Sequence, residues 1–139
     1  MFTCRAEGAA DPAVVWELFA TPQRWSEWSP HVRGAWGLDG PRLEKGARGY
    51  VRLLSAVPVP FEITAVEPGR LWTWKVGPVE MVHRVEATAG GCAAAIDIGA
   101  PPPIEAALRV GYAPVVNLLL ARLLAKAAAA STTARSGLG

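Results

Sequence analysis

Pairs of turn-forming residues divide the middle of the chain into short segments of similar length. Pro-Gly, Gly-Pro and Gly-Gly pairs lie at residues 68–69, 77–78 and 90–91, and the segments between and beside them are rich in Val, Ile and Trp. Turns this short force neighbouring strands to pair antiparallel. The punctuation predicts a run of antiparallel strands, which we expect at residues 31–38, 47–54, 59–67, 70–76, 79–88 and 91–99.

Two proline-containing caps predict small helices ahead of these strands. Residues 2–7 have the composition of a first strand, and Asp11-Pro12 then places a helix N-cap before a proline at the first helical position. Thr21-Pro22 repeats this signal ten residues later. We therefore expect two small helices between the first strand and the following ones.

An apolar repeat with helical spacing follows the last predicted strand. From Ile104 to Leu124 the apolar residues recur every three or four positions, which is typical of a helix with one buried face. Pro114 should kink or restart this helix. The repeat ends near residue 130, so we expect a single domain over residues 1–130 and a flexible C-terminal tail over residues 131–139.

The order of these elements predicts an α+β fold, in which a curved antiparallel sheet of about seven strands wraps around a long C-terminal helix. A sheet that faces a single helix must curl to cover it. Space left between the concave face of the sheet and the helix would form a pocket for a hydrophobic small molecule.

Charge and cysteine patterns argue against several classes of function. The 14 Lys and Arg residues are scattered and nearly balanced by 12 Asp and Glu, so we expect no nucleic-acid partner. Cys4 and Cys92 lack the spacing of a metal site, and we expect neither a metal nor another cofactor. The polar N-terminus predicts a cytoplasmic protein. The longest apolar run spans about 13 residues, against about 20 for a bilayer, so we expect no integral membrane association.

Alternation along each strand assigns the apolar side chains to one face, which we expect to be the concave face. In residues 59–67 this rule turns Phe61, Ile63 and Ala65 inward. On the next two strands it places two tryptophans, a methionine and a histidine on the same face. With positions on the C-terminal helix, the candidate ligand-binding residues are Phe61, Ile63, Trp72, Trp74, Met81, His83, Tyr112, Asn117, Leu119 and Leu123.

Three polar residues of this region have different expected roles. The Tyr112 hydroxyl could orient a carbonyl group of the ligand. Asn117 lies in an apolar helix, where a buried amide without a partner would cost about 1–3 kcal/mol, so it either bonds across the cavity or reaches solvent. Asp97 alternates with two isoleucines and should lie in water.

His83 is the candidate catalytic residue. A histidine on an apolar face can transfer protons near neutral pH, as aldol cyclisation or dehydration of a poly-β-keto chain would require. A histidine in such a place is more often a hydrogen-bonded residue of the core or its rim. Both interpretations remain open at this point.

Several stretches resemble the SRPBCC superfamily of START-like, helix-grip proteins, and in particular its polyketide cyclase/dehydrase members. These stretches are residues 11–19, 22–30, 58–69, 71–74, 83–86 and 90–91. The resemblance covers about residues 3 to 128 and implies a single START-like domain that binds a polyketide-like or lipid-like molecule between the sheet and the C-terminal helix. It also implies an alternative, an aromatase-type cyclase/dehydrase that acts in the same cavity with His83.

A third hypothesis makes the chain a partner-binding module. Trp25 and Trp28 are three residues apart, so both rings can lie on one side of the second small helix. If they were exposed, they could dock on a protein or a membrane surface. In each case we expect a monomer or a homodimer.

Overall fold

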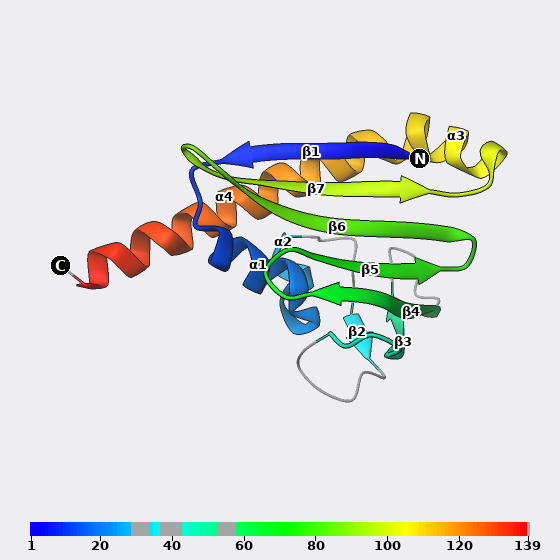
Figure 1. The fold of residues 1–139 in the computed structure, drawn as a ribbon, viewed down its shortest axis with the longest axis horizontal. Helices are drawn as coiled ribbons and strands as arrows, with labels where there is room; N and C mark the ends of the chain where they lie inside the picture. Colours follow the sequence, from blue (N-terminus) through cyan, green and yellow to red (C-terminus); the bar gives the residue numbers. More distant parts are fainter. Residues whose placement is uncertain (29–33, 37–42, 53–57, 139) are drawn as a thin grey trace.

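Seven antiparallel strands form one curved sheet in the part of the chain that the computed structural model describes, residues 1–28, 34–36, 43–52 and 58–138 (Figure 1). The strands are β1 (Phe2–Gly8), β2 (Gly34–Trp36), β3 (Arg48–Arg52), β4 (Pro58–Glu67), β5 (Leu71–Val76), β6 (Val79–Thr88) and β7 (Gly91–Gly99). Their order across the sheet is β1-β7-β6-β5-β4-β3-β2. The predicted meander is therefore confirmed, and the first strand joins it beside the last one. The predicted strands at residues 31–38 and 47–54 lie partly outside the described residues.

Tight turns connect the central strands because glycine can adopt the left-handed backbone conformation that they require. Gly69, between β4 and β5, has φ 77°, and Gly77, between β5 and β6, has φ 57°. Residues with a side chain rarely adopt these angles, whereas glycine does so without steric cost. These two turns keep β4, β5 and β6 in register as neighbours.

The helices follow the predicted order and lie on one side of the sheet. They are α1 (Pro12–Ala20), the 3-10 helix η1 (Pro22–Arg24), α2 (Trp25–Trp28), α3 (Pro102–Gly111) and α4 (Ala113–Leu138). The Asp11 side chain caps α1 by accepting a hydrogen bond from the backbone N–H of Ala13, at 2.9 Å. Pro114 restarts the C-terminal helix as expected, because helix α3 ends at Gly111 and α4 begins two residues later.

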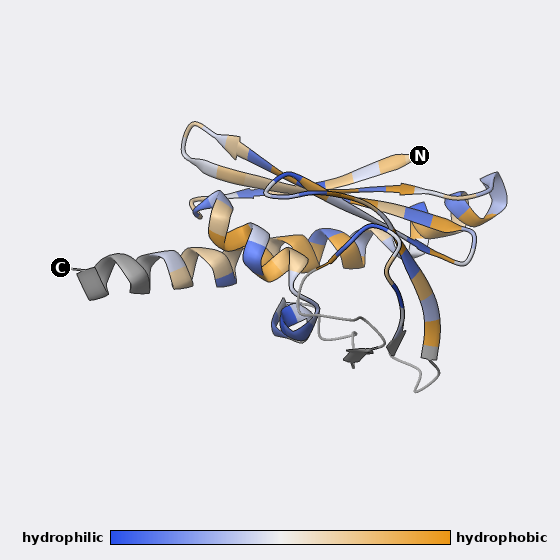
Figure 2. Ribbon diagram, turned by 60° about the horizontal axis from the view of Figure 1, so that its bottom comes forward, coloured by the Kyte–Doolittle hydropathy of each residue, from blue (hydrophilic) through white to orange (hydrophobic). Residues whose placement is uncertain are grey.

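Helix α4 supplies much of the core. It packs mainly against β1 and α1, and Figure 2 shows α1 and α4 on the same side of the sheet. Leu120 and Leu123 are fully buried, as are Leu18 and Phe19 of α1. Each buried side chain of this size contributes about 1.5–3 kcal/mol relative to its exposed state. The α+β fold class, with a curved sheet against a long C-terminal helix, is thus confirmed.

Helix α4 extends past the end of the apolar repeat and has an exposed outer side. The helix continues to Leu138, and the division into a domain over residues 1–130 and a flexible tail stays a prediction. By length and composition, Ala113–Ser131 could also cross a membrane, although the unbroken apolar run in the sequence is shorter. About a third of this stretch is buried in the domain, and Leu118 on its outer side is 69% exposed.

A β-bulge in β4 changes which side chains face the helices. Ile63 pairs with Trp74, but the register shifts before Ala65, which pairs with Thr73, and Val66 then pairs with Trp72. Directly paired residues of antiparallel strands lie on the same face of a sheet. Val66 therefore faces inward and packs against the core, and the prediction that Ala65 faces inward is wrong. Simple alternation fails here because the bulge adds one residue to the strand.

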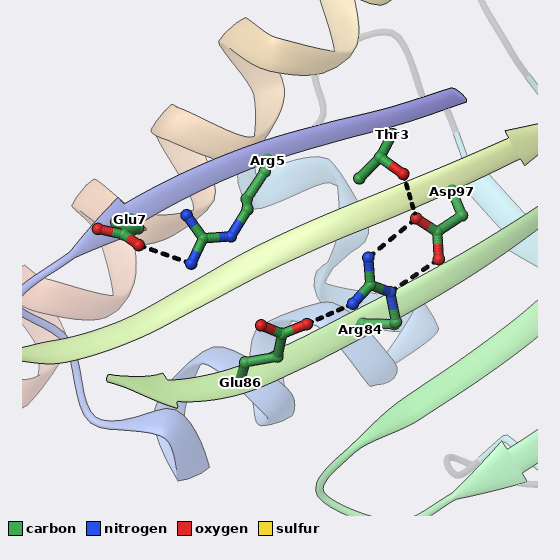
Figure 3. Close-up of polar contacts among 6 residues, drawn as sticks. All are labelled: Thr3, Arg5, Glu7, Arg84, Glu86 and Asp97. Atoms are coloured by element: carbon green, nitrogen blue, oxygen red, sulfur yellow. Dashed lines mark hydrogen bonds and ion pairs between the residues drawn. The ribbon is translucent and has the colours of Figure 1, made fainter. Parts of the chain in front are cut away.

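The outer face of the sheet carries an ion-pair network that joins its first, sixth and seventh strands (Figure 3). Arg84 binds Asp97 through two hydrogen bonds, Nε to Oδ2 at 2.7 Å and Nη2 to Oδ1 at 2.9 Å, and Thr3 donates to the same carboxylate at 2.6 Å. Arg84 also pairs with Glu86.

Asp97 is therefore not a solvated residue as expected, although it does lie on the outer face. Partial burial raises the pKa of its carboxyl, but the hydrogen bonds from Arg84 and Thr3 outweigh that effect and leave the pKa below its usual value. The correction arises because β1 pairs with β7, which brings the Thr3 hydroxyl to the Asp97 carboxylate.

Candidate functional site

An aromatic cluster covers the inner face of the sheet where α1 and α2 approach it. Its members, from α1, α2, β4, β5 and β6, are Phe19, Trp25, Trp28, Phe61, Trp72, Trp74 and His83. Alternation along the strands correctly predicts the members from β5 and β6. The contribution of the helices depends on how they fold back over the sheet, which the sequence pattern does not specify.

Trp72 lies at the centre of this aromatic cluster. Its ring stacks on that of His83, with centroids 3.6 Å apart and planes at 4°, and on that of Trp25, with centroids 5.3 Å apart and planes at 12°. Phe19 and Trp74 meet it edge to face. Its side chain is only 1% exposed. Trp72 is thus a packed core residue, and both faces of its indole are occupied by protein.

Trp25 and Trp28 are shielded from solvent and hydrogen-bonded. Their indole Nε1–H groups donate to the carbonyl oxygens of Phe19 and Leu18, each at 2.9 Å. The two residues are 2% and 6% exposed. The hypothesis that they form an exposed docking patch is therefore wrong, because they are buried between α1 and the sheet.

His83 is buried and neutral in this environment. Its residue is 3% exposed, and Nδ1 lies 3.2 Å from the carbonyl oxygen of Trp72, so Nδ1 carries the proton and donates it. Burial is the main cause that lowers its pKa from 6.5 to about 3. An imidazole with this pKa holds no exchangeable second proton at neutral pH and is a weak base. The geometry favours the structural interpretation of His83 over the catalytic one.

Two indole N–H groups of the cluster differ from the others in their hydrogen bonding. Among the described residues, the Nε1 atoms of Trp72 and Trp74 are the buried side-chain nitrogens without a hydrogen-bond acceptor. Both residues project from β5 on the inner face, two positions apart, with ring centroids separated by 5.6 Å. Sequence reasoning named both residues for their rings and missed the unsatisfied donors, which depend on packing.

Beside the cluster, four apolar residues of β5 and β6 form a half-buried platform. Trp74 pairs with Met81 and Val76 pairs with Val79, so the four side chains lie together on the inner face. All four pack against the core without being fully covered. Helix α4, which packs mainly on β1, leaves this part of the sheet less enclosed. Within the described ranges, the platform is an accessible apolar surface on the concave side.

The remaining candidate residues divide into three groups. Ile63, Leu119 and Leu123 are buried in the core. Tyr112 is half-buried where α3 meets α4, and burial raises the pKa of its hydroxyl. Asn117 is exposed on α4 and therefore reaches solvent, which is one of the two positions expected for it.

The hollow lined by described residues is not where the sequence led us to expect it. It has a volume of about 460 Å³ and lies at β3, β4 and β5, with Arg48, Gly49, Tyr50, Pro60, Phe61, Glu62, Lys75 and Gly77 around it. Arg48, Glu62 and Lys75 pair across the outer face of the sheet. In the described part, the aromatic cluster fills the inner face of the sheet beneath α1 and α2, and the cavity between sheet and α4 stays a prediction. Of the candidate ligand-binding residues, Phe61 alone borders the hollow.

Potential metal ligands do not gather in the described residues. No group of three or more His, Cys, Asp or Glu side chains is close enough there to hold a metal ion. Cys4 and Cys92 are buried free thiols whose pKa values are raised by burial. The thiols are therefore protonated at neutral pH and have little nucleophilic character.

Comparison with known proteins identifies relatives of the whole domain. The sequence model of the family described as polyketide cyclase / dehydrase and lipid transport matches residues 2–132. No curated protein sequence matches the chain.

Solved structures show the same fold at low sequence identity. A crystal structure of a Staphylococcus saprophyticus protein is similar with a TM-score of 0.71 and 15% identity, over 87% of this chain and 86% of that one. DynU16, a putative protein in the dynemicin biosynthetic locus, has a TM-score of 0.66 and 21% sequence identity, over 91% of this chain and 48% of that one. The crystal structure of Ara h 8.0201 has a TM-score of 0.62 and 12% sequence identity, over 89% of this chain and 97% of that one.

Proposed function

Because the chain belongs to the polyketide cyclase / dehydrase and lipid transport family, a family of the SRPBCC, START-like type, we propose that it binds a polyketide-like or lipid-like molecule on the concave side of its sheet. The observation that carries this proposal is the platform of Trp74, Val76, Val79 and Met81, whose apolar side chains are half-buried on the inner face. Trp74 belongs both to this platform and to the aromatic cluster, so the proposed site borders the cluster.

Burial of apolar surface would supply the binding free energy. A ligand that removes about 300 Å² of apolar surface from water gains about 7 kcal/mol before the cost of its own ordering is subtracted. Trp74 offers a rigid ring on which an aromatic ligand can stack with little loss of conformational entropy. Location in the cytoplasm and a monomeric or homodimeric state stay predictions.

A titration with naphthalene, followed by tryptophan fluorescence, tests this binding. Met81→Gln places an amide in the apolar platform and should weaken binding at least fivefold. Glu80→Gln introduces the same side chain one position earlier, where it faces the outer side, and should leave binding unchanged. Failure of the wild-type protein to bind naphthalene, or equal binding by both variants, would contradict the proposal.

The second candidate function is a polyketide cyclase/dehydrase of the aromatase type, acting on a ligand in the same place. The two unpartnered indole N–H groups favour it, because donors aimed at a carbonyl oxygen stabilise the negative charge that develops during enolisation. His83 would not act as the acid, since its imidazole is neutral at neutral pH. Turnover of a poly-β-keto mimic that is unchanged in His83→Gln and lost in Trp74→Phe would support this form of the reaction.

A further inference from the structure

We propose that the indole N–H groups of Trp72 and Trp74 are the polar anchors of the ligand site and that they select an uncharged ligand with a carbonyl oxygen. This inference rests on the proposed binding function and names the class of molecule that the site takes. It starts from a contrast among the four indoles of the aromatic cluster.

The contrast is that two of these indoles are satisfied by the protein and two are not. Trp25 and Trp28 donate to backbone carbonyl oxygens at 2.9 Å. Trp72 and Trp74 have buried Nε1 atoms and no acceptor in the described part of the molecule. Both unsatisfied donors belong to β5, the strand that contributes Trp74 to the platform. Trp74 is itself part of the platform, and Trp72, the other unsatisfied donor, adjoins it with ring centroids 5.6 Å apart.

A buried donor without an acceptor is unfavourable, which gives a ligand with an acceptor an advantage. Folding removes water from the N–H group, and the lost hydrogen bond is recovered only when another acceptor arrives. The acceptor must come from a molecule that also tolerates apolar surroundings, because the rings of Trp72 and Trp74 both pack among other aromatic rings. A ketone, ester or amide oxygen on a hydrophobic body meets both conditions.

Charge on the sheet distinguishes a neutral carbonyl from a carboxylate. The inward-facing residues of β5 and β6 are uncharged, and His83 among them is neutral. The charged residues of β6, including Glu80, Arg84 and Glu86, lie on the outer face. Against the described inner faces of β5 and β6, a carboxylate would be buried without a counter-ion, which costs more than two hydrogen bonds return. The site should therefore discriminate against free acids.

Three naphthalene derivatives of similar size test this selectivity. Acetylnaphthalene carries a neutral carbonyl, ethylnaphthalene replaces it with a methylene group, and naphthoate carries an anionic carboxylate. At neutral pH we expect acetylnaphthalene to bind about tenfold more tightly than ethylnaphthalene, and naphthoate to bind more weakly than both. Trp74→Phe keeps an aromatic ring but removes one donor, so it should reduce the ratio of ketone affinity to hydrocarbon affinity several-fold.

Proton NMR of the unmodified protein provides a readout that does not depend on how a variant folds. Acetylnaphthalene should move the indole N–H resonances of Trp72 and Trp74 downfield, while those of Trp25 and Trp28, which already donate to carbonyl oxygens, serve as internal controls.

The outcomes separate this inference from the proposed function. Tighter binding of the ketone together with shifts confined to the two β5 indoles supports the inference. Equal binding of ketone and hydrocarbon, or tighter binding of naphthoate, overturns the selectivity while the binding function stands. If none of the three compounds binds, both the inference and the binding function fail.

Discussion

Acid should destabilise this protein through one buried imidazole, and the effect can be isolated by removing it. In the unfolded chain His83 has its ordinary pKa of 6.5, whereas in the folded protein burial lowers the pKa to about 3. Between these two values the unfolded state binds the proton and the folded state does not. The free energy of unfolding therefore falls as the pH falls through this window, and the loss is complete only below the folded pKa.

The size of the effect follows from the two pKa values. Between pH 7 and pH 4.5 the His83 contribution to the free energy of unfolding should decrease by about 2.5 kcal/mol. His83→Phe retains a flat ring against Trp72 but cannot titrate. The unfolding free energy of this variant should consequently depend less steeply on pH than that of the wild type, whatever its absolute stability at neutral pH.

Urea denaturation followed by circular dichroism at both pH values measures this difference directly. Carboxylates with lowered pKa values, such as Asp97 and Glu27, also lose their stabilising contacts in acid, but they are present in both proteins and cancel in the comparison. Parallel pH dependence in the two proteins would show that His83 is accessible to protons, and the argument for a neutral buried imidazole would be refuted.

Five further substitutions, two matched pairs and one single change, test the packing, with urea or thermal denaturation as the measurement. Gly91→Ala should cost about 2 kcal/mol or more, because its Cβ would lie 2.2 Å from a backbone oxygen of the first strand; Gly90→Ala, with open space, should cost less than about 0.5 kcal/mol. Leu120→Ala should cost about 3–5 kcal/mol, and the exposed Leu118→Ala almost nothing. Asp97→Asn should cost about 1–2 kcal/mol. Equal losses within either pair, or an unchanged Asp97→Asn protein, would contradict the assigned contacts.

The sequence predicts the positions of most strands and helices because their signals are local. Turn residues such as Gly69 and Gly77 mark the ends of strands, and alternation alone places Trp72 and His83 on the same face. The resemblance to the superfamily can be recognised for the same reason, because helix caps, turns and core aromatic residues are visible in the sequence itself.

The details of the site depend on tertiary packing and could not be predicted in the same way. The spacing of Trp25 and Trp28 indicates that both rings share one side of a helix, but not that this side covers Trp72. That covering closes the inner face of the sheet beneath α2. The partial exposure of Met81 likewise reflects the position of α4 over β1, a long-range property that no short pattern encodes.

The β-bulge in β4 determines which side chains in the second half of that strand face the interior. Ile63 and Val66 both reach the interior although three positions separate them, a spacing that an unbroken pleat would send to opposite sides. The same residues paired without the bulge would turn the strand's second half over, exposing the valine and turning the neighbouring alanine inward. The bulge, more than the chemistry of any one side chain, therefore determines which side chains of β4 the aromatic rings meet.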